Sequence, residues 1–168
     1  GNLITGAKWA AVFYPSLAAI AFYWLLRANK VKFAFIWTLF FLVSSHSFLY
    51  RMSMARVQSI SLLFLILGIL FITRKRYIAL AILSFFFVWL YDGYFMLIVI
   101  VVIFFFSKWL IEKECDLKLL IYFFAGLFLG MIINPYFPEN IESYIYNMTR
   151  VSKESALVKV GVEWKPHN

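Results

Sequence analysis

The fold of this chain is decided by residues 77–110, which read YIALAILSFFFVWLYDGYFMLIVIVVIFFFSKWL. Asp92 is the only acidic residue in this stretch, and Lys108 is its only base. One straight helix of this length would be about 50 Å long, whereas the hydrocarbon core of a membrane is about 30 Å thick. Asp92-Gly93 is a strong turn signal. We therefore expect two short apolar helices, Tyr77–Leu90 and Tyr94–Leu110, with an acidic turn between them.

The composition of the whole chain indicates a membrane protein. Hydrophobic residues make up 64% of the 168 residues, and mean hydropathy is +0.86. Charged residues make up only 14%, whereas a soluble domain has about 25%. The net charge of +8 does not indicate a nucleic-acid partner, because the bases cluster in short loops between apolar runs, as they do on the cytoplasmic face of membrane proteins. We expect an all-α integral membrane protein.

The apolar residues form six runs that predict about six short or broken transmembrane helices. These runs are Trp9–Leu26, Phe33–Leu49, Val57–Thr73, Tyr77–Leu90, Tyr94–Leu110 and Leu119–Ile133. Pro15 is expected to kink the first run, and Asn134-Pro135 to end the last. We thus expect a transmembrane region, 1–133, and an extracytoplasmic segment, 134–168.

The segment after Pro138 is polar with scattered apolar residues. Ile141, Tyr144, Ile145 and Met148 recur at helical spacing, which predicts a short amphipathic helix along the membrane. Because the chain begins without Met and stops within this polar segment, we expect a truncated piece of a longer polytopic protein.

The distribution of bases predicts the orientation. Three alternate loops carry eight of the sixteen bases: Arg27, Lys30, Lys32, Arg74, Lys75, Arg76, Lys113 and Lys118. The positive-inside bias assigns these loops to the cytoplasm. Arg51, Arg56, Asp92 and the turn at 134–138 then belong to the outer face.

The outer-face residues suggest a phosphate site. Arg51 and Arg56 could bind a lipid phosphate or pyrophosphate through their guanidinium groups, with His46 in the polar patch just upstream. Asp92 could act as a base or form an ion pair with the arginines. Equally, the arginines could simply reach lipid headgroups, and Asp92 could lie in a solvated turn. The single cysteine, Cys115, excludes an internal disulfide, and no metal-binding signature is present.

Three stretches resemble GT-C glycosyltransferases, a class of polytopic membrane enzymes. They are INPYFPEN at 133–140, VGVEWKP at 160–166, and the arginine-led helix start at 51–61. The resemblance implies hexosyl or pentosyl transfer from a polyprenyl-phosphate-linked donor on the outer face of a bacterial or archaeal plasma membrane. The hallmark acid of the family lies in the first outer loop, but no acidic residue precedes Asp92 here.

The resemblance also implies roles for individual residues. Asp92 is expected to deprotonate the acceptor, and Arg51, Arg56 and His46 to hold the lipid phosphate. Binding of sugar or acceptor is expected from four further residues: Asn134, Tyr136, Glu163 and Trp164. A divalent metal, if the enzyme uses one, would be bound outside this chain.

Two readings from other classes remain open. A transporter or flippase fragment would line its substrate path with Asp92 and the broken helices, and a membrane scaffold would carry out no chemistry. The expected partners are membrane lipid and the polyprenyl-linked donor; the sequence does not indicate the oligomeric state.

Overall fold

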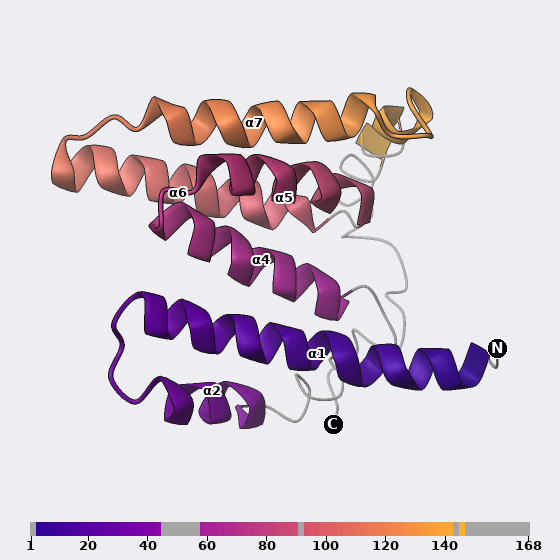
Figure 1. Ribbon diagram of the computed structural model, residues 1–168. Coiled ribbons are helices and arrows are strands. Elements are labelled where there is room, and N and C mark those ends of the chain that lie inside the picture. Colours follow the sequence, from indigo (N-terminus) through magenta and orange to yellow (C-terminus); the bar gives the residue numbers. More distant parts are fainter. Residues whose placement is uncertain (1–2, 45–57, 91–92, 143–144, 147–168) are drawn as a thin grey trace, which may run out of the picture. The chain divides into compact units, whose positions relative to one another are not determined.

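The computed structural model describes residues 3–44, 58–90, 93–142 and 145–146, and all regular secondary structure in these ranges is helical (Figure 1). The chain divides into two compact units, Gly1–Gly130 and Met131–Asn168. The labelled helices are α1 (Leu3–Ala28), α2 (Ala34–Val43), α4 (Gln58–Thr73), α5 (Tyr77–Leu90), α6 (Tyr94–Glu112) and α7 (Leu117–Ile132). The expectation of an all-α fold is thus confirmed.

The break expected near Asp92-Gly93 is also confirmed, because α5 ends at Leu90 and α6 begins at Tyr94. Pro15 does not end α1, which continues for more than three turns beyond it. Next to the proline, the Ser16 hydroxyl donates a hydrogen bond of 2.7 Å to the Val12 carbonyl oxygen. Helix α2 ends at Val43, and residues 45–49 of the second apolar run lie outside the described part of the chain.

The helices of the first unit alternate in direction. Turns of a few residues join α1 to α2, α4 to α5 and α6 to α7, so each of these pairs is antiparallel (Figure 1). The C-terminal ends of α1, α4 and α6 lie at the left of Figure 1, on the same side as the N-terminal ends of α2, α5 and α7. We call this side the basic end, because the turns there contain Lys30, Lys75 and Lys113. The other side is called the opposite end.

Small and branched side chains form the contact between α1 and α4. Ala18, Ala21 and Leu25 of α1 are buried against Ile66 of α4. Alanine side chains let the two helix backbones approach closely, which strengthens packing between apolar helices. The α1–α4 pair is therefore held by close fit along its length.

Helix α5 packs against α4 and α6 through a fully buried apolar surface. Leu80 and Phe87 of α5 and Leu97 of α6 are all completely shielded from solvent. The rings of Phe87 and Phe64 of α4 lie 5.2 Å apart. Burying a large apolar side chain contributes roughly 1.5–3 kcal/mol in an aqueous reference state.

Two glycines of α7 bring its backbone against α5. A Cβ on Gly126 would clash with the Ala81 carbonyl group and the Ser84 hydroxyl, and a Cβ on Gly130 would lie 2.6 Å from the Phe85 carbonyl oxygen. Ser84 Oγ also lies 3.2 Å from the Phe123 carbonyl oxygen, to which it donates. The pair Gly126 and Gly130 is a small-xxx-small motif, which permits such close helix contacts.

Lysines occupy the left-handed position that follows three helices at the basic end. Lys30, Lys75 and Lys113 have φ values of 56°, 53° and 55°. After α1, the amide of Lys30 donates to the Arg27 carbonyl and that of Val31 to the Leu26 carbonyl. This is a Schellman motif, in which glycine is the usual residue. A lysine there places a positive charge at the negative end of the helix dipole.

The second unit contains a turn and a short helical segment. Residues 139–142 and 145–146 are helical, in partial agreement with the expected amphipathic helix. Ile141 and Ile145 lie in these residues, whereas Tyr144 and Met148 lie outside the described part of the chain.

Among the helices that the structure describes, two are long and apolar enough to cross a membrane, judged by length and composition: Lys8–Ala28 within α1, and Tyr94–Glu112. The other apolar helices have 10 to 16 residues. A helix of 16 residues is about 24 Å long, which is shorter than a typical hydrocarbon core of about 30 Å.

Candidate functional site

Most of the residues that the sequence predicts for the site lie outside the part of the chain that the structure describes. These are His46, Arg51, Arg56, Asp92, Glu163 and Trp164. Their proposed roles and their mutual distances therefore stay predictions.

The helix ends that flank three of these residues lie on one side of the first unit. Helix α4 begins at Gln58, α5 ends at Leu90 and α6 begins at Tyr94, all at the opposite end (Figure 1). The segments 45–57 and 91–92, which contain Arg51, Arg56 and Asp92, connect to these helix ends. This arrangement is compatible with the expected common face.

The described side chains at the opposite end combine polar and aromatic groups. Ser59 and Ser61 in the first turn of α4 are buried, as is Tyr94 at the start of α6. Trp89, near the end of α5, donates a hydrogen bond of 2.8 Å from Nε1 to the Gly130 carbonyl oxygen. Tryptophan and tyrosine near helix ends are typical of membrane interfaces.

Asn134 and Tyr136 belong to the second unit, and both lie in the turn that follows α7. Asn134 Oδ1 accepts a hydrogen bond of 3.0 Å from the backbone amide of Tyr136, so this amide oxygen stabilises the turn. The side chain of Tyr136 is 72% exposed. Within the same unit, Asn140 Nδ2 donates to the Met131 carbonyl oxygen at 3.1 Å. Substrate binding by Asn134 and Tyr136 stays a prediction.

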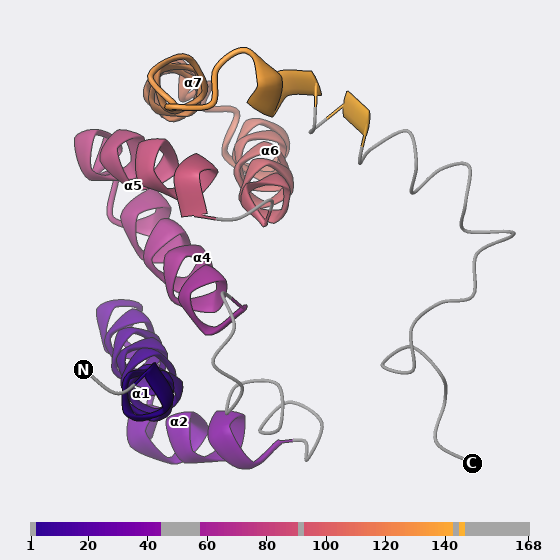
Figure 2. The same cartoon turned by 90° about the vertical axis from the view of Figure 1, so that its right-hand side faces the viewer.

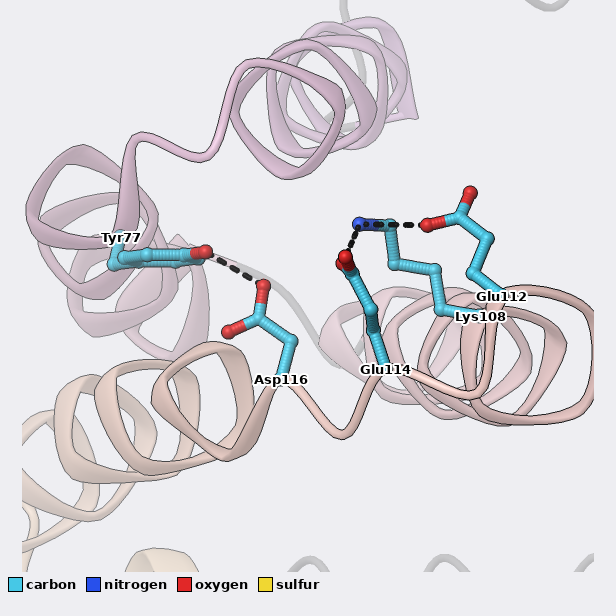
Figure 3. Close-up of polar contacts among 5 residues, drawn as sticks. All are labelled: Tyr77, Lys108, Glu112, Glu114 and Asp116. Carbon is cyan, nitrogen blue, oxygen red and sulfur yellow. Dashed lines mark hydrogen bonds and ion pairs between the residues drawn. The ribbon is translucent and has the colours of Figure 1, made fainter.

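A polar cluster at the basic end was not anticipated from the sequence (Figure 3). The Tyr77 hydroxyl of α5 donates a 2.6 Å hydrogen bond to Asp116 Oδ2, just before α7. Lys108 Nζ lies 3.3 Å from Glu112 Oε2 and 3.8 Å from Glu114 Oε2. The only signal in the sequence was a loop, 112–118, of mixed charge. It did not indicate which helices the loop would contact.

This polar cluster is suited to holding helices together. The hydrogen bond between Tyr77 and Asp116 ties the start of α5 to the start of α7, and the ring of Tyr77 stacks on that of Tyr122 with centroids 6.0 Å apart. No group of three or more His, Cys, Asp or Glu residues that could hold a metal occurs among the described residues.

A second feature of the basic end joins two turns that are distant in sequence. Arg74 Nη2 donates a hydrogen bond of 3.0 Å to the Ala28 carbonyl oxygen. The turn between α4 and α5 therefore lies beside the turn between α1 and α2. Both turns are rich in exposed bases.

Comparison with known proteins does not assign this chain to a family. The sequence matches no family model, and no curated protein and no solved structure is significantly similar to it. The described residues therefore define the class only as an all-α protein in which two of the described helices are long and apolar enough to cross a membrane.

Proposed function

We propose that this chain is an integral membrane protein whose helices contact lipid. The surface of α6 supports this proposal most strongly. One face of α6 is buried inside the unit, with Leu97 and Val101 both completely shielded. Most of the rest of its surface is apolar, and seven apolar residues there are at least 49% exposed: Met96, Val99, Ile103, Phe106, Trp109, Leu110 and Ile111. Its polar residues Ser107, Lys108 and Glu112 lie near its C-terminal end. A helix that is apolar over most of its surface requires an apolar environment on its outer side as well.

A surface of this kind is not suited to water. Monomeric soluble proteins rarely expose contiguous apolar patches larger than a few hundred Å². In this protein, exposed apolar side chains occur not only on α6 but also on other helices, including Phe40 of α2, Ile78 of α5 and Phe128 of α7. A lipid bilayer would cover these surfaces without a protein partner.

We further propose that the protein is a GT-C-like glycosyltransferase that uses a polyprenyl-phosphate-linked sugar. Two features support this proposal: the sequence resemblance, and the common side of the helix ends next to Arg51, Arg56 and Asp92. In this mechanism the two arginines bind the lipid phosphate and offset the charge of the leaving group. Asp92 removes the proton of the acceptor hydroxyl. The site faces away from the cytoplasm.

Donor turnover tests the catalytic proposal. Membranes containing the protein are incubated with polyprenyl-phosphate-linked hexoses and pentoses, and release of polyprenyl phosphate is measured by mass spectrometry. Asp92→Asn should slow turnover by about 10²–10⁴, the usual contribution of a general base. Arg51→Ala should slow it by about 10²–10³, as does loss of a charge-stabilising donor.

Matched controls lie at the basic end. Arg76→Ala and Glu114→Gln remove one base and one acid from exposed positions and should leave turnover unchanged. If Asp92→Asn and Arg51→Ala both turn over the donor at the wild-type rate, the proposed site is wrong.

Cysteine labelling tests the orientation separately. In a Cys115→Ser background, Asp92→Cys should react with a membrane-impermeant maleimide added to intact cells. Lys75→Cys, at the basic end, should react only after permeabilisation. The reverse pattern would invert the proposed topology.

A further inference from the structure

The two turns joined by Arg74 form one continuous basic surface. The hydrogen bond from Arg74 Nη2 to the Ala28 carbonyl oxygen holds the α4–α5 turn against the end of α1, and both turns lie at the basic end in Figure 1. Besides Arg74, five exposed bases belong to this surface: Arg27, Lys30, Lys32, Lys75 and Arg76. We call these five side chains and Arg74 the basic surface.

The charge of the basic surface is not balanced by carboxylates of its own helices. The chain contains no acidic residue before Asp92. Both ion pairs described at this end belong to Lys108, with Glu112 and Glu114. The mixed-charge segment 112–118 is different, because Lys113 and Lys118 are accompanied there by three acidic residues, Glu112, Glu114 and Asp116. Among the described residues of the first unit, the basic surface therefore has the largest excess of positive charge.

Exposed apolar side chains begin directly beside these bases. Trp24 of α1, Phe33 and Ile36 at the start of α2, and Ile78 of α5 are each more than half exposed. A ligand for this region would therefore carry an anionic group next to long apolar chains. Phosphate oxygens suit guanidinium and ammonium groups, and acyl chains suit the apolar faces.

We propose that the basic surface binds the headgroup phosphate of anionic phospholipids, whose acyl chains lie along α1, α2 and α5. The inference rests on the proposed membrane placement but is independent of the glycosyltransferase activity. Basic residues next to a membrane attract anionic lipid strongly, with about a fivefold effect for each residue. Five neutralised positions should therefore change lipid preference by more than an order of magnitude.

Native mass spectrometry of the protein released from nanodiscs tests this inference. The discs contain equal amounts of phosphatidylglycerol and phosphatidylcholine, and the ratio of retained lipids is measured. The wild type should retain phosphatidylglycerol preferentially. A variant with Arg27→Gln, Lys30→Gln, Lys32→Gln, Lys75→Gln and Arg76→Gln should lose about tenfold or more of this preference. Arg74 is kept because its side chain joins the turns.

The matched control is Lys113→Gln with Lys118→Gln, which removes bases from the mixed-charge segment 112–118 and should leave the preference nearly unchanged. An equal loss of preference in this control would overturn the inference, and so would an unchanged ratio in the five-residue variant. Displacement of phosphatidylglycerol by millimolar inorganic phosphate would identify a free-phosphate site instead. Preferential capture of a single-stranded RNA oligonucleotide over anionic vesicles would also overturn it.

Insertion is measured in parallel, so that a failure of the proposed membrane placement can be distinguished from a failure of the proposed lipid site. Wild type and variant are reconstituted into uncharged phosphatidylcholine vesicles, washed with alkaline carbonate and floated. Flotation of both shows that the variant still inserts. If neither protein floats, the membrane placement itself is wrong; if both float and both retain phosphatidylglycerol equally, only the lipid site is wrong.

Discussion

The indole Nε1 of Trp89, near the end of α5, donates a 2.8 Å hydrogen bond to the backbone carbonyl oxygen of Gly130 on α7. Gly130 lacks a side chain, and a Cβ there would lie 2.6 Å from the Phe85 carbonyl oxygen. The two helices therefore lie at close range, and Figure 2 also shows α5 and α7 as neighbours. This contact joins segments about forty residues apart, and it can be tested directly.

Trp89→Phe should destabilise the α5–α7 contact by about 0.5–1.5 kcal/mol, the usual net value of one hydrogen bond. Phenylalanine keeps an aromatic ring near Phe85, whose centroid lies 5.3 Å from that of Trp89, but removes the donor. Thermal unfolding in uncharged detergent measures the change. Trp24→Phe is the control, because Trp24 is 62% exposed; equal losses in both variants would show that the hydrogen bond is unimportant.

Gly126→Ala should destabilise the protein more strongly, by about 1–3 kcal/mol, as is typical of overpacking. The added methyl group would clash with the Ala81 carbonyl group and the Ser84 hydroxyl of α5, so the helices must separate. The same unfolding measurement applies. Gly6→Ala is the matched control within a helix, since nothing lies within 4 Å of its added Cβ. It should be neutral or slightly stabilising, and a melting temperature of Gly126→Ala at or above the wild type would contradict the packing.

Tyr77→Phe should weaken the attachment of the α6–α7 loop to α5. It removes the 2.6 Å hydrogen bond to Asp116 but keeps a ring that can stack on Tyr122. We expect a loss of about 1 kcal/mol, because the bond is only partly buried. Hydrogen exchange should show faster exchange at the start of α7. Tyr122→Phe, which retains both the Tyr77 hydroxyl and the stacked rings, should leave exchange there unchanged.

Lys75→Gly should stabilise the end of α4. Lys75 has a φ of 53°, and the left-handed conformation costs a non-glycine residue roughly 1–2 kcal/mol. Greater freedom of glycine in the unfolded chain offsets part of this gain, so we expect about 0.5–1 kcal/mol in uncharged detergent. Lys32→Gly is the control, because Lys32 is not among the residues with positive φ. Lower stability of Lys75→Gly than of Lys32→Gly would contradict the backbone geometry.

Local signals were sufficient to locate most helices. Helix α5 has the bounds of its apolar run, and α6 and α7 differ from theirs by about two residues. The Asp92-Gly93 signal correctly separated α5 from α6, because a turn dipeptide interrupts an apolar helix through its own backbone preferences. The composition likewise indicated an all-α chain.

The sequence could name the residues of the candidate site but not their arrangement in space. Arg51, Arg56 and Asp92 could be assigned to one face from the order of loops, but their distances stay predictions. The Lys108 ion pairs and the Tyr77–Asp116 hydrogen bond depend on how the α6–α7 loop folds back. No local pattern contains this information.

The sequence by itself located most of the described helices, the turns between them and the basic loops, because these properties depend on neighbouring residues. Only the tertiary structure decided which helices pair, including the contact of Gly126 with α5 and of Arg74 with the end of α1. The physical reason is that these helices are apolar on nearly every face. Hydrophobicity therefore does not select the packing face, and the choice depends on close fit and on individual hydrogen bonds.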